Sequence, residues 1–311
     1  MTNSKNREPP FALSSKVELS FLLAVPPGDL GYVISRIDRF YVHDERPKPN
    51  GGTRVLLKPR GRLIKIQAQI KRRILDRVPP LPFVHGGIRR RSILTNAAPH
   101  VGREVVLALD IKDCFPNISP QKVLGVFNEL GITGDAAGIL VKLTTFEFQL
   151  PQGTKTSPAL ANLVLRSIDR RLHALAKQHC CSYTRYVDDI VLSGSMRLIK
   201  LQGLVHRIIC SEGFKLKTQK EVMLQSEPQV VTKLLVNQKV NVTRDRRDAI
   251  RREVFKQVAD AQTNISASTI GKVRWLESVN PDVGSNLLAR IPNRPSAGAG
   301  RNPVLPHIIK P

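Results

Sequence analysis

Two adjacent aspartates and a third far upstream are the side chains of this chain best suited to chemistry. Asp188 and Asp189 end the segment Tyr-Val-Asp-Asp at residues 186–189, which joins two β-rich stretches, 182–185 and 190–193. Carboxylates side by side at a hairpin tip repel each other unless a cation neutralises them. A divalent ion held there binds phosphate oxygens, which is the chemistry of phosphoryl and nucleotidyl transfer. Taken alone, an Asp-Asp pair more often marks a solvated turn.

The third acid, Asp110, ends an apolar run at residues 103–109 that predicts a buried strand. Pro116 helps to end the turn that follows, so the Asp110 carboxylate is expected to face a cleft. On neighbouring strands of one sheet, Asp110 and Asp188 could hold two Mg²⁺ ions about 3.5–4 Å apart. Asp113, just downstream, is expected to pair with a nearby Lys or Arg instead.

Between these acids, a loop at residues 149–158 leads into a long helical pattern at 159–177. Gly153 lets the backbone approach another group closely, and the Gln152 amide offers both a donor and an acceptor. By itself this is an ordinary junction between a loop and a helix. Its place between the acids predicts a floor for an incoming nucleotide.

Six segments, in this order along the chain, resemble the motifs of reverse transcriptases. They are residues 50–54 with Pro59, 63–65 and Gln67, then 110–115, 150–157, 186–189, 211–220 and 231–237. The resemblance implies an α+β, right-hand polymerase fold with fingers, palm and thumb, whose antiparallel palm sheet carries the 186–189 hairpin. It implies an RNA-directed DNA polymerase, a nucleotidyltransferase that uses two Mg²⁺ ions.

Residues 96–100, Asn-Ala-Ala-Pro-His, resemble the element that retron reverse transcriptases have ahead of the first catalytic strand. The retron resemblance implies that a structured noncoding RNA is copied into single-stranded DNA in anti-phage defence, primed from a 2′-hydroxyl and yielding a branched RNA–DNA hybrid, msDNA. An effector protein is a further expected partner. Lys233 stands where retron enzymes usually carry glycine. Other defence-associated or abortive-infection reverse transcriptases, with untemplated or self-primed synthesis, therefore remain alternatives, as does an inactive RNA-binding scaffold.

The resemblance also implies which residues form the catalytic centre. The expected catalytic residues are Asp110, Asp188, Asp189 and Lys220. The first three are also the expected metal ligands, assisted by the main-chain carbonyl of Ile111. Lys220 is expected to give a proton to the departing pyrophosphate.

Contacts with the nucleotide and the nucleic acid are implied in the same way. Arg54 is expected to hold the triphosphate, because its guanidinium fork matches phosphate oxygens. Phe115 is expected to press where a ribose 2′-hydroxyl would lie and so to favour dNTPs, although core packing is an alternative role. The other expected nucleotide contacts are Gln152 and Gly153. The expected contacts with RNA and primer are Asn96, His100, Val231, Thr232 and Lys233.

Composition favours a polyanionic partner. Forty-nine Lys and Arg against 25 Asp and Glu give a formal net charge of +24 and an isoelectric point near 10.5. A folded chain this basic attracts polyanions. The basic residues are spread along the sequence, which suits a long groove that follows an RNA–DNA duplex. Charge alone would equally suit a ribosomal or RNA-chaperone protein.

The 311 residues, 41% of them hydrophobic, allow two or three subdomains. We expect an N-terminal extension at 1–30, fingers at 31–105 continuing at about 120–155, a palm at 106–119 and 156–230, the fifth motif and a helical thumb at 231–290, and a flexible basic tail at 291–311. A helix at 123–130 is expected to cross the back of the palm. Trp275 is expected to anchor the thumb core.

Cysteine use and hydropathy give an expected location. The four cysteines show no metal-ligand spacing and are expected to be reduced thiols in the cytoplasm. No apolar run approaches the roughly 18 residues of a membrane span, so no membrane partner is expected.

Overall fold

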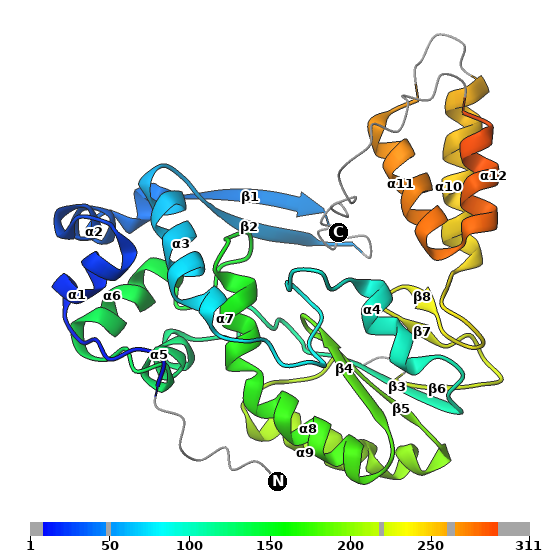
Figure 1. Cartoon of the computed structure of the whole chain (residues 1–311), viewed down its shortest axis with the longest axis horizontal. Helices are drawn as coiled ribbons and strands as arrows, with labels where there is room; N and C mark the ends of the chain where they lie inside the picture. Colours follow the sequence, from blue (N-terminus) through cyan, green and yellow to red (C-terminus); the bar gives the residue numbers. More distant parts are fainter. Residues whose placement is uncertain (1–8, 48–50, 218–220, 260–264, 292–311) are drawn as a thin grey trace.

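The computed structural model describes residues 9–47, 51–217, 221–259 and 265–291, and helices and strands are mixed throughout (Figure 1). The N-terminal part packs helices against one long hairpin. Its elements are α1 (Lys16–Leu23), α2 (Pro27–Ile34), the 3₁₀ helix η1 (Ile37–Phe40), β1 (Tyr41–Pro47), β2 (Thr53–Pro59), α3 (Arg62–Arg73) and the 3₁₀ helix η2 (Leu75–Arg77). Strands β1 and β2 pair antiparallel, with Arg46 opposite Arg54.

Helix α3 shows how the sequence specifies this part of the fold. Leu63, Ile66 and Ile70 recur at helical spacing and are buried. Three basic residues in its last turn lie where the helix dipole favours positive charge. An amphipathic helix therefore packs its apolar face into the core.

The central element is an antiparallel sheet with strand order β4-β5-β3-β6 among the described residues. Its strands are β3 (Val105–Asp110), β4 (Ser182–Tyr186), β5 (Asp189–Gly194) and β6 (Val222–Leu224). The strand expected at 103–109 is therefore confirmed as β3. Strand β3 pairs with β5 on one side and with β6 on the other.

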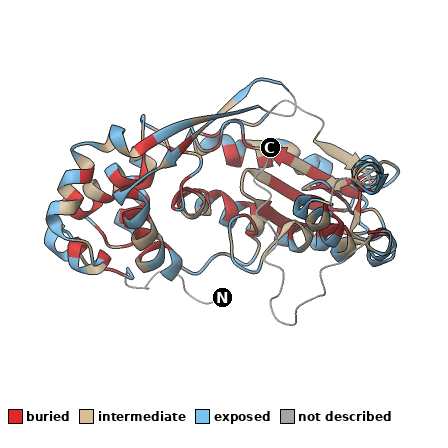
Figure 2. Cartoon of the chain, turned by 90° about the horizontal axis from the view of Figure 1, so that it is seen from above, coloured by how far each residue is buried: buried red, intermediate tan, exposed pale blue. Residues whose placement is uncertain are grey.

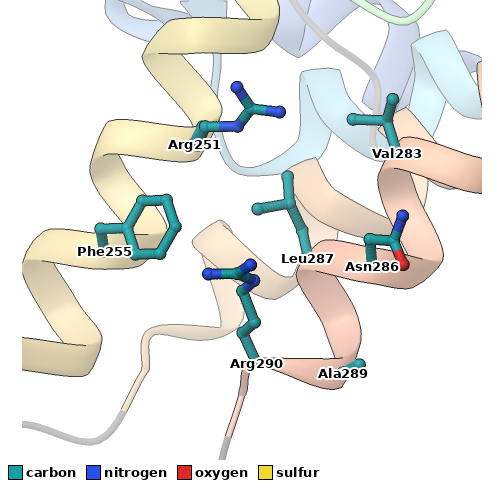
Figure 3. A pocket seen from close by; sticks show the side chains of 7 residues that line it. All are labelled: Arg251, Phe255, Val283, Asn286, Leu287, Ala289 and Arg290. Atoms are coloured by element: carbon teal, nitrogen blue, oxygen red, sulfur yellow. The ribbon is translucent and has the colours of Figure 1, made fainter.

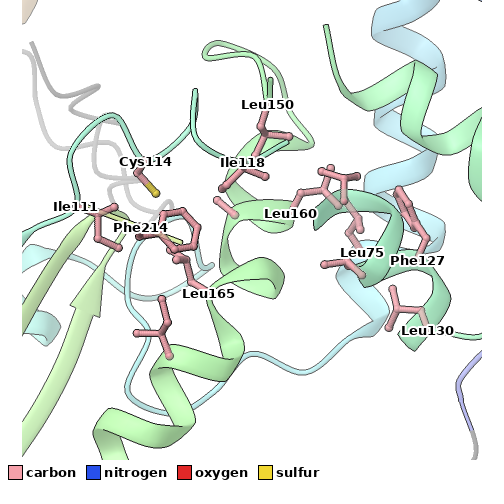
Figure 4. Close-up of a cluster of buried hydrophobic side chains, with 14 of the residues drawn as sticks. Leu75, Ile111, Cys114, Ile118, Phe127, Leu130, Leu150, Leu160, Leu165 and Phe214 are labelled. Carbon is pink, nitrogen blue, oxygen red and sulfur yellow. The ribbon is translucent and has the colours of Figure 1, made fainter. Parts of the chain in front are cut away.

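Both faces of strand β3 are buried, which is why its sequence is apolar without alternation. Leu107 and Leu109 belong to a large core that includes the side chains labelled in Figure 4, among them Ile111, Leu165 and Phe214. Val106, on the opposite face, belongs to a separate C-terminal core. The members of that core are Ala97, Val106, Val191, Val231, Leu234, Val236, Val242, Ile250, Val254, Val273, Trp275, Leu276, Leu287 and Ile291.

The helix expected at 159–177 is two helices, α7 (Ser157–Val164) and α8 (Arg166–Gln178), which meet at Leu165. This stretch contains neither Gly nor Pro, so nothing in it indicates a break. Leu165 is completely buried in the large core, and its backbone leaves the helical conformation there. Packing therefore decides the position of the bend.

Helices α8 and α9 (Gln202–Ser211) lie along the sheet, with the 3₁₀ helix η4 (Met196–Leu201) before α9 (Figure 1). Helix α5 (Pro120–Glu129) packs instead with α6 (Gly134–Thr144) and α7. The expectation that this segment crosses the back of the palm stays a prediction.

The C-terminal part begins after the sheet and covers its other face. Its elements are β7 (Val230–Val231), β8 (Leu234–Leu235), β9 (Asn241–Val242), α10 (Arg244–Ala259), α11 (Ala267–Val279) and α12 (Pro281–Ala289), joined by α4 (Ile93–Ala97) and the 3₁₀ helix η3 (Ala98–His100) from upstream. Trp275 is buried in the C-terminal core, as expected, and the Arg246 guanidinium lies 4.1 Å from its ring centre.

A pocket of about 720 Å³ lies between α10 and α12, where the guanidinium of Arg290 is 5.3 Å from the ring centre of Phe255 (Figure 3). Buried residues run through the interior of both parts of the molecule (Figure 2).

Within the described ranges, no single helix combines the length and apolar composition of a membrane span. The sharply bent pair α1 and α2 meets that test only when taken together.

Candidate active site

The three aspartates lie at one edge of the central sheet. Asp110 is the last residue of β3 and stands opposite Asp189, the first residue of β5. Tyr186, at the end of β4, also stands opposite Asp189, so Val187 and Asp188 form the turn between the two strands. The Ile111 N–H donates to the Asp188 carbonyl over 3.0 Å, which ties the end of β3 to this turn. Residues far apart in the sequence thus share one strand edge.

The donor set at this edge suits a hard divalent cation, because carboxylate oxygens are ligands that Mg²⁺ takes from proteins. The Lys217 ammonium lies 2.8 Å from Asp110 Oδ2, so this carboxylate already faces a cation. Across the described residues, no three His, Cys, Asp or Glu side chains are grouped closely enough to hold a metal ion. An ion bound here therefore requires side-chain rotation on a backbone that already brings the three acids to one edge.

The 149–158 loop lies against the hairpin strand that carries Arg54. The Leu57 N–H donates to the Gln152 carbonyl over 2.7 Å. Gly153 has φ +110°, and a Cβ at this position would lie 3.4 Å from the Leu57 carbonyl oxygen. A side chain is therefore disfavoured by the backbone conformation. Arg54, Gln152 and Gly153 thus come from two segments in direct contact.

Phe115 lies in the turns that follow β3, and it is half-buried against the large core. Cys114 beside it is buried, while Asp113 is exposed with φ +46°. The ring of Phe115 is therefore supported by the core and partly open to solvent. Asp113 makes no ion pair within the described ranges, so the expected pairing with a Lys or Arg was wrong.

Asn96 and His100 require a correction. Both side chains are completely buried and cannot touch a nucleic acid bound at the surface. The His100 ring joins two strands instead, with Nδ1 2.7 Å from Ser193 Oγ and Nε2 2.7 Å from Thr184 Oγ1. Burial, followed by the charge of Arg103, lowers the pKa of His100 to about 3, so the ring is neutral.

The expected contacts at 231–233 occupy the hairpin between β7 and β8. The Val231 side chain is completely buried in the C-terminal core, so its expected contact with nucleic acid does not involve that side chain. Thr232 and Lys233 form the two-residue turn, with φ +45° and +67°. Such turns favour glycine at these positions, so Lys233 adopts a strained backbone where retron enzymes usually carry glycine.

Lys220 lies outside the described residues. Two residues that the sequence analysis did not single out lie at the site. Lys217 contacts Asp110 through its ammonium. Lys215 lies two residues earlier, which is the period of an extended segment, and its carbonyl accepts from the Lys112 N–H over 2.8 Å. Arg185 precedes the Tyr-Val-Asp-Asp segment directly and is completely buried. A charged residue inside an otherwise buried strand was the available signal.

Comparison with known proteins identifies the family of this chain. Residues 46–240, more than half of the chain, match the family described as “Reverse transcriptase (RNA-dependent DNA polymerase)”. The chain belongs to the reverse transcriptase family. The family predicted from the six motifs is therefore confirmed.

Two bacterial relatives define the type. Retron Mx65 reverse transcriptase of Myxococcus xanthus is 34% identical over 274 residues, which are 81% of this chain and 64% of that protein. Retron Ec86 reverse transcriptase of Escherichia coli is 34% identical over 214 residues, 68% of this chain and 67% of that protein. The chain spans about two thirds of the length of these relatives. It belongs to the retron type of reverse transcriptases, as the 96–100 element predicted.

A solved structure of telomerase from Candida albicans, in complex with a fragment of telomeric RNA, has a TM-score of 0.47 at 10% identity. The alignment covers 84% of this chain and 58% of that one. The family assignment rests on the sequence matches and not on this distant likeness.

Proposed function

We propose that this chain is an RNA-directed DNA polymerase that copies a structured noncoding RNA into single-stranded DNA in anti-phage defence. The observation that carries the proposal is the meeting of Asp110, Asp188 and Asp189 at one sheet edge in a member of this family. Its substrates are dNTPs and an RNA template and primer, its product is an RNA–DNA hybrid, and an effector protein is a further partner.

The proposed architecture is a right hand. The sheet that carries the 186–189 hairpin is the palm, at 106–119 and 156–230. The β1–β2 hairpin and its helices form fingers at 31–105 and about 120–155, after an N-terminal extension at 1–30. Residues 231–290 form the fifth motif and the thumb. The separate C-terminal core supports this division, because domains have cores of their own.

Members of this family use divalent metal ions, and the carboxylate set here fits Mg²⁺. Asp110, Asp188, Asp189 and the Ile111 carbonyl are the proposed ligands of two ions. When bound, the ions supply electrostatic stabilisation of the charge that develops on the reacting phosphate. The proposed task of Lys220 is to give a proton to the departing pyrophosphate.

The nucleotide is held by residues of the fingers and the loop after α6. Arg54 binds the triphosphate through its guanidinium, and Gln152 and Gly153 contact the incoming nucleotide. Phe115 presses on the sugar where a 2′-hydroxyl would lie. The contact between Gln152 and Leu57 supports this grouping, because it joins the loop to the strand that carries Arg54.

Thr232 and Lys233 are the proposed contacts to primer or RNA, since Lys233 is exposed at its turn. A lysine in a strained turn supplies a charge that glycine lacks. Phosphate contacts of this kind make affinity fall steeply as salt rises, by about tenfold or more for several contacts between 50 and 200 mM.

Primer extension on an RNA template with Mg²⁺ tests the proposal. Asp188→Asn should abolish DNA synthesis and leave RNA binding unchanged. Asp113→Asn is the matched control, because it removes an exposed carboxylate close to Asp110 that has no proposed role. DNA synthesis retained by Asp188→Asn would overturn the metal assignment. If the wild-type chain binds RNA but makes no DNA, the inactive scaffold is favoured. If it makes DNA without a template, untemplated addition is favoured.

A further inference from the structure

The guanidinium of Arg185 is fully enclosed directly beneath the carboxylate turn. Its Nε and Nη2 donate to Asp169 Oδ1 and Oδ2, each over 2.7 Å, and both side chains are 0% exposed. Its Nη1 donates in two further directions, to Asn162 Oδ1 over 3.0 Å and to the Val187 carbonyl over 2.6 Å. One planar group thus joins α8, α7 and the 186–189 turn.

Stability alone is a weak reason for such a group. Enclosing a charge pair carries a large desolvation penalty, and apolar residues often replace buried pairs without loss. Burial lowers the pKa of Arg185, but the charge and the hydrogen bonds of Asp169 raise it by more. The net shift of this pKa is therefore upward. The fixed fork of the guanidinium offers what apolar packing lacks, namely donors at set angles.

Val187, whose carbonyl accepts the fourth of these bonds, is a strained residue. Val187 has φ +60°, a conformation that β-branched side chains rarely adopt. Such strain persists only where the surroundings over-determine the backbone, and it occurs often at active sites. The Arg185 bond to the Val187 carbonyl fixes the orientation of the peptide that leads into Asp188.

A second contact fixes the turn from the side. Residues 83–85 run beside β4, with the His85 N–H donating to the Arg185 carbonyl over 2.8 Å. Gly86 follows, and a Cβ there would lie 2.3 Å from the Val187 nitrogen. Only glycine permits this approach. Asn162 Nδ2 donates to the Gly86 carbonyl over 2.9 Å, so the same asparagine bonds both supports of the turn.

Asn162 lies on α7, which starts directly after the loop that carries Gln152 and Gly153. The nucleotide loop and the carboxylate turn are therefore ends of one hydrogen-bonded unit. We propose that Arg185 is a positioning residue, which together with Asn162 fixes the Val187–Asp188 peptide so that Asp188 and Asp189 face Asp110 in register with the nucleotide loop. This inference rests on the proposed function.

Arg185→Lys tests it, because lysine keeps the buried charge beside Asp169 but lacks the planar fork that makes two bonds to Asp169 and reaches Asn162 and Val187 as well. We expect kcat for primer extension to fall by about 10- to 100-fold, the scale of a misplaced catalytic group. We expect the half-saturating Mg²⁺ concentration to rise several-fold, while KM for dNTP and RNA affinity stay within about twofold of the wild-type values, since no contact to substrate is removed.

Tyr183→Phe is the matched control. The Tyr183 hydroxyl donates to Asp169 Oδ1 over 2.6 Å, in the same buried network but away from the turn. It should lower the melting temperature and leave kcat within about twofold of the wild-type value. If folded Arg185→Lys matches Tyr183→Phe in kcat and Mg²⁺ dependence, the proposal is wrong. If Arg185→Lys does not fold, Asn162→Ala decides, because it should lower kcat with KM unchanged, and a wild-type kcat would overturn the proposal.

Mn²⁺ binding, followed by electron paramagnetic resonance on the same proteins, separates this inference from the proposed function. A wild-type chain without synthesis would refute the function and leave the positioning role to be decided by Mn²⁺ affinity. The role is supported if Arg185→Lys binds Mn²⁺ more weakly than Tyr183→Phe does, and it is refuted if the two bind equally. Asn162→Ala takes the place of Arg185→Lys in this comparison if the lysine variant does not fold.

Discussion

Two aspartate–cation pairs lie under and beside the same hairpin, and their surroundings differ sharply. Asp169 and Arg185 are 0% exposed and share two bonds of 2.7 Å. The Lys217 ammonium lies 2.8 Å from Asp110 Oδ2, with 46% and 15% of the two side chains exposed, and the Lys217 N–H donates to the Asp110 carbonyl over 2.9 Å. The first pair is locked by a fork and by further partners. The ion pair of the second is made by a flexible lysine side chain that water can reach.

The difference separates a structural carboxylate from one that can bind a ligand. A buried carboxylate with all its bonds made to protein holds helices and strands in place but cannot accept a new ligand. A carboxylate at a strand edge, facing an ammonium that is 46% exposed, can exchange that cation for another. The fold therefore uses the same residue type twice, and solvent access decides which role each serves.

The largest expected effect compares the two acids directly. Asp169→Asn should lower the free energy of unfolding by about 3–5 kcal/mol, because Arg185 is left as an unpaired buried charge. Asp110→Asn should change it by no more than about 1 kcal/mol, since a pair whose lysine is open to water contributes little, while abolishing DNA synthesis. Urea denaturation and primer extension measure the two quantities. Equal losses of stability in both variants would remove the distinction.

An intermediate effect concerns His100, which is buried between Thr184 of β4 and Ser193 of β5. The folded pKa of His100, about 3, lies below its ordinary value of 6.5, so the unfolded chain binds the extra proton at mildly acidic pH. Its contribution to stability is complete above pH 6.5 and is lost as pH falls toward 3. Between pH 7.5 and 5.5 the free energy of unfolding should drop by about 1.4 kcal/mol from this residue.

His100→Gln provides the control for this pH dependence. Denaturation curves at the two pH values should show a smaller drop in the variant, whatever its absolute stability. The same drop in both proteins would show that other groups are responsible. His85 is a second contributor of the same sign, because burial lowers its pKa to about 4.

The smallest effect concerns the exchangeable pair. Lys217→Ala removes a cation that competes at Asp110, so the Mg²⁺ concentration for half-maximal synthesis should fall by about two- to fivefold, the scale of a partly exposed pair. Lys215→Ala, two residues earlier and also exposed, is the matched control and should leave this concentration unchanged. A rise in the Mg²⁺ requirement of Lys217→Ala would mean that Lys217 aids the bound ion instead of competing with it.

Much of the site could be read from the sequence, because its signals are local. The apolar run before Asp110 and the β-rich stretches around residues 186–189 each specify a strand with a carboxylate at its end. The helical spacing of α3 and the family motifs needed no knowledge of distant contacts. The burial of Asn96 and His100 was missed because a motif match shows that residues matter but not which way they point.

By itself, the sequence determined the reverse transcriptase family, the retron type, and the three acids at a strand end and in a hairpin tip, since these depend on residue types at short spacing. Only the tertiary structure decided that the 159–177 stretch bends at Leu165, that His100 joins two strands, and that Arg185 lies beneath the turn. The physical reason is common to all three. Each depends on which side chains lose water when distant segments pack together, and neither propensity nor periodicity along the chain encodes that loss.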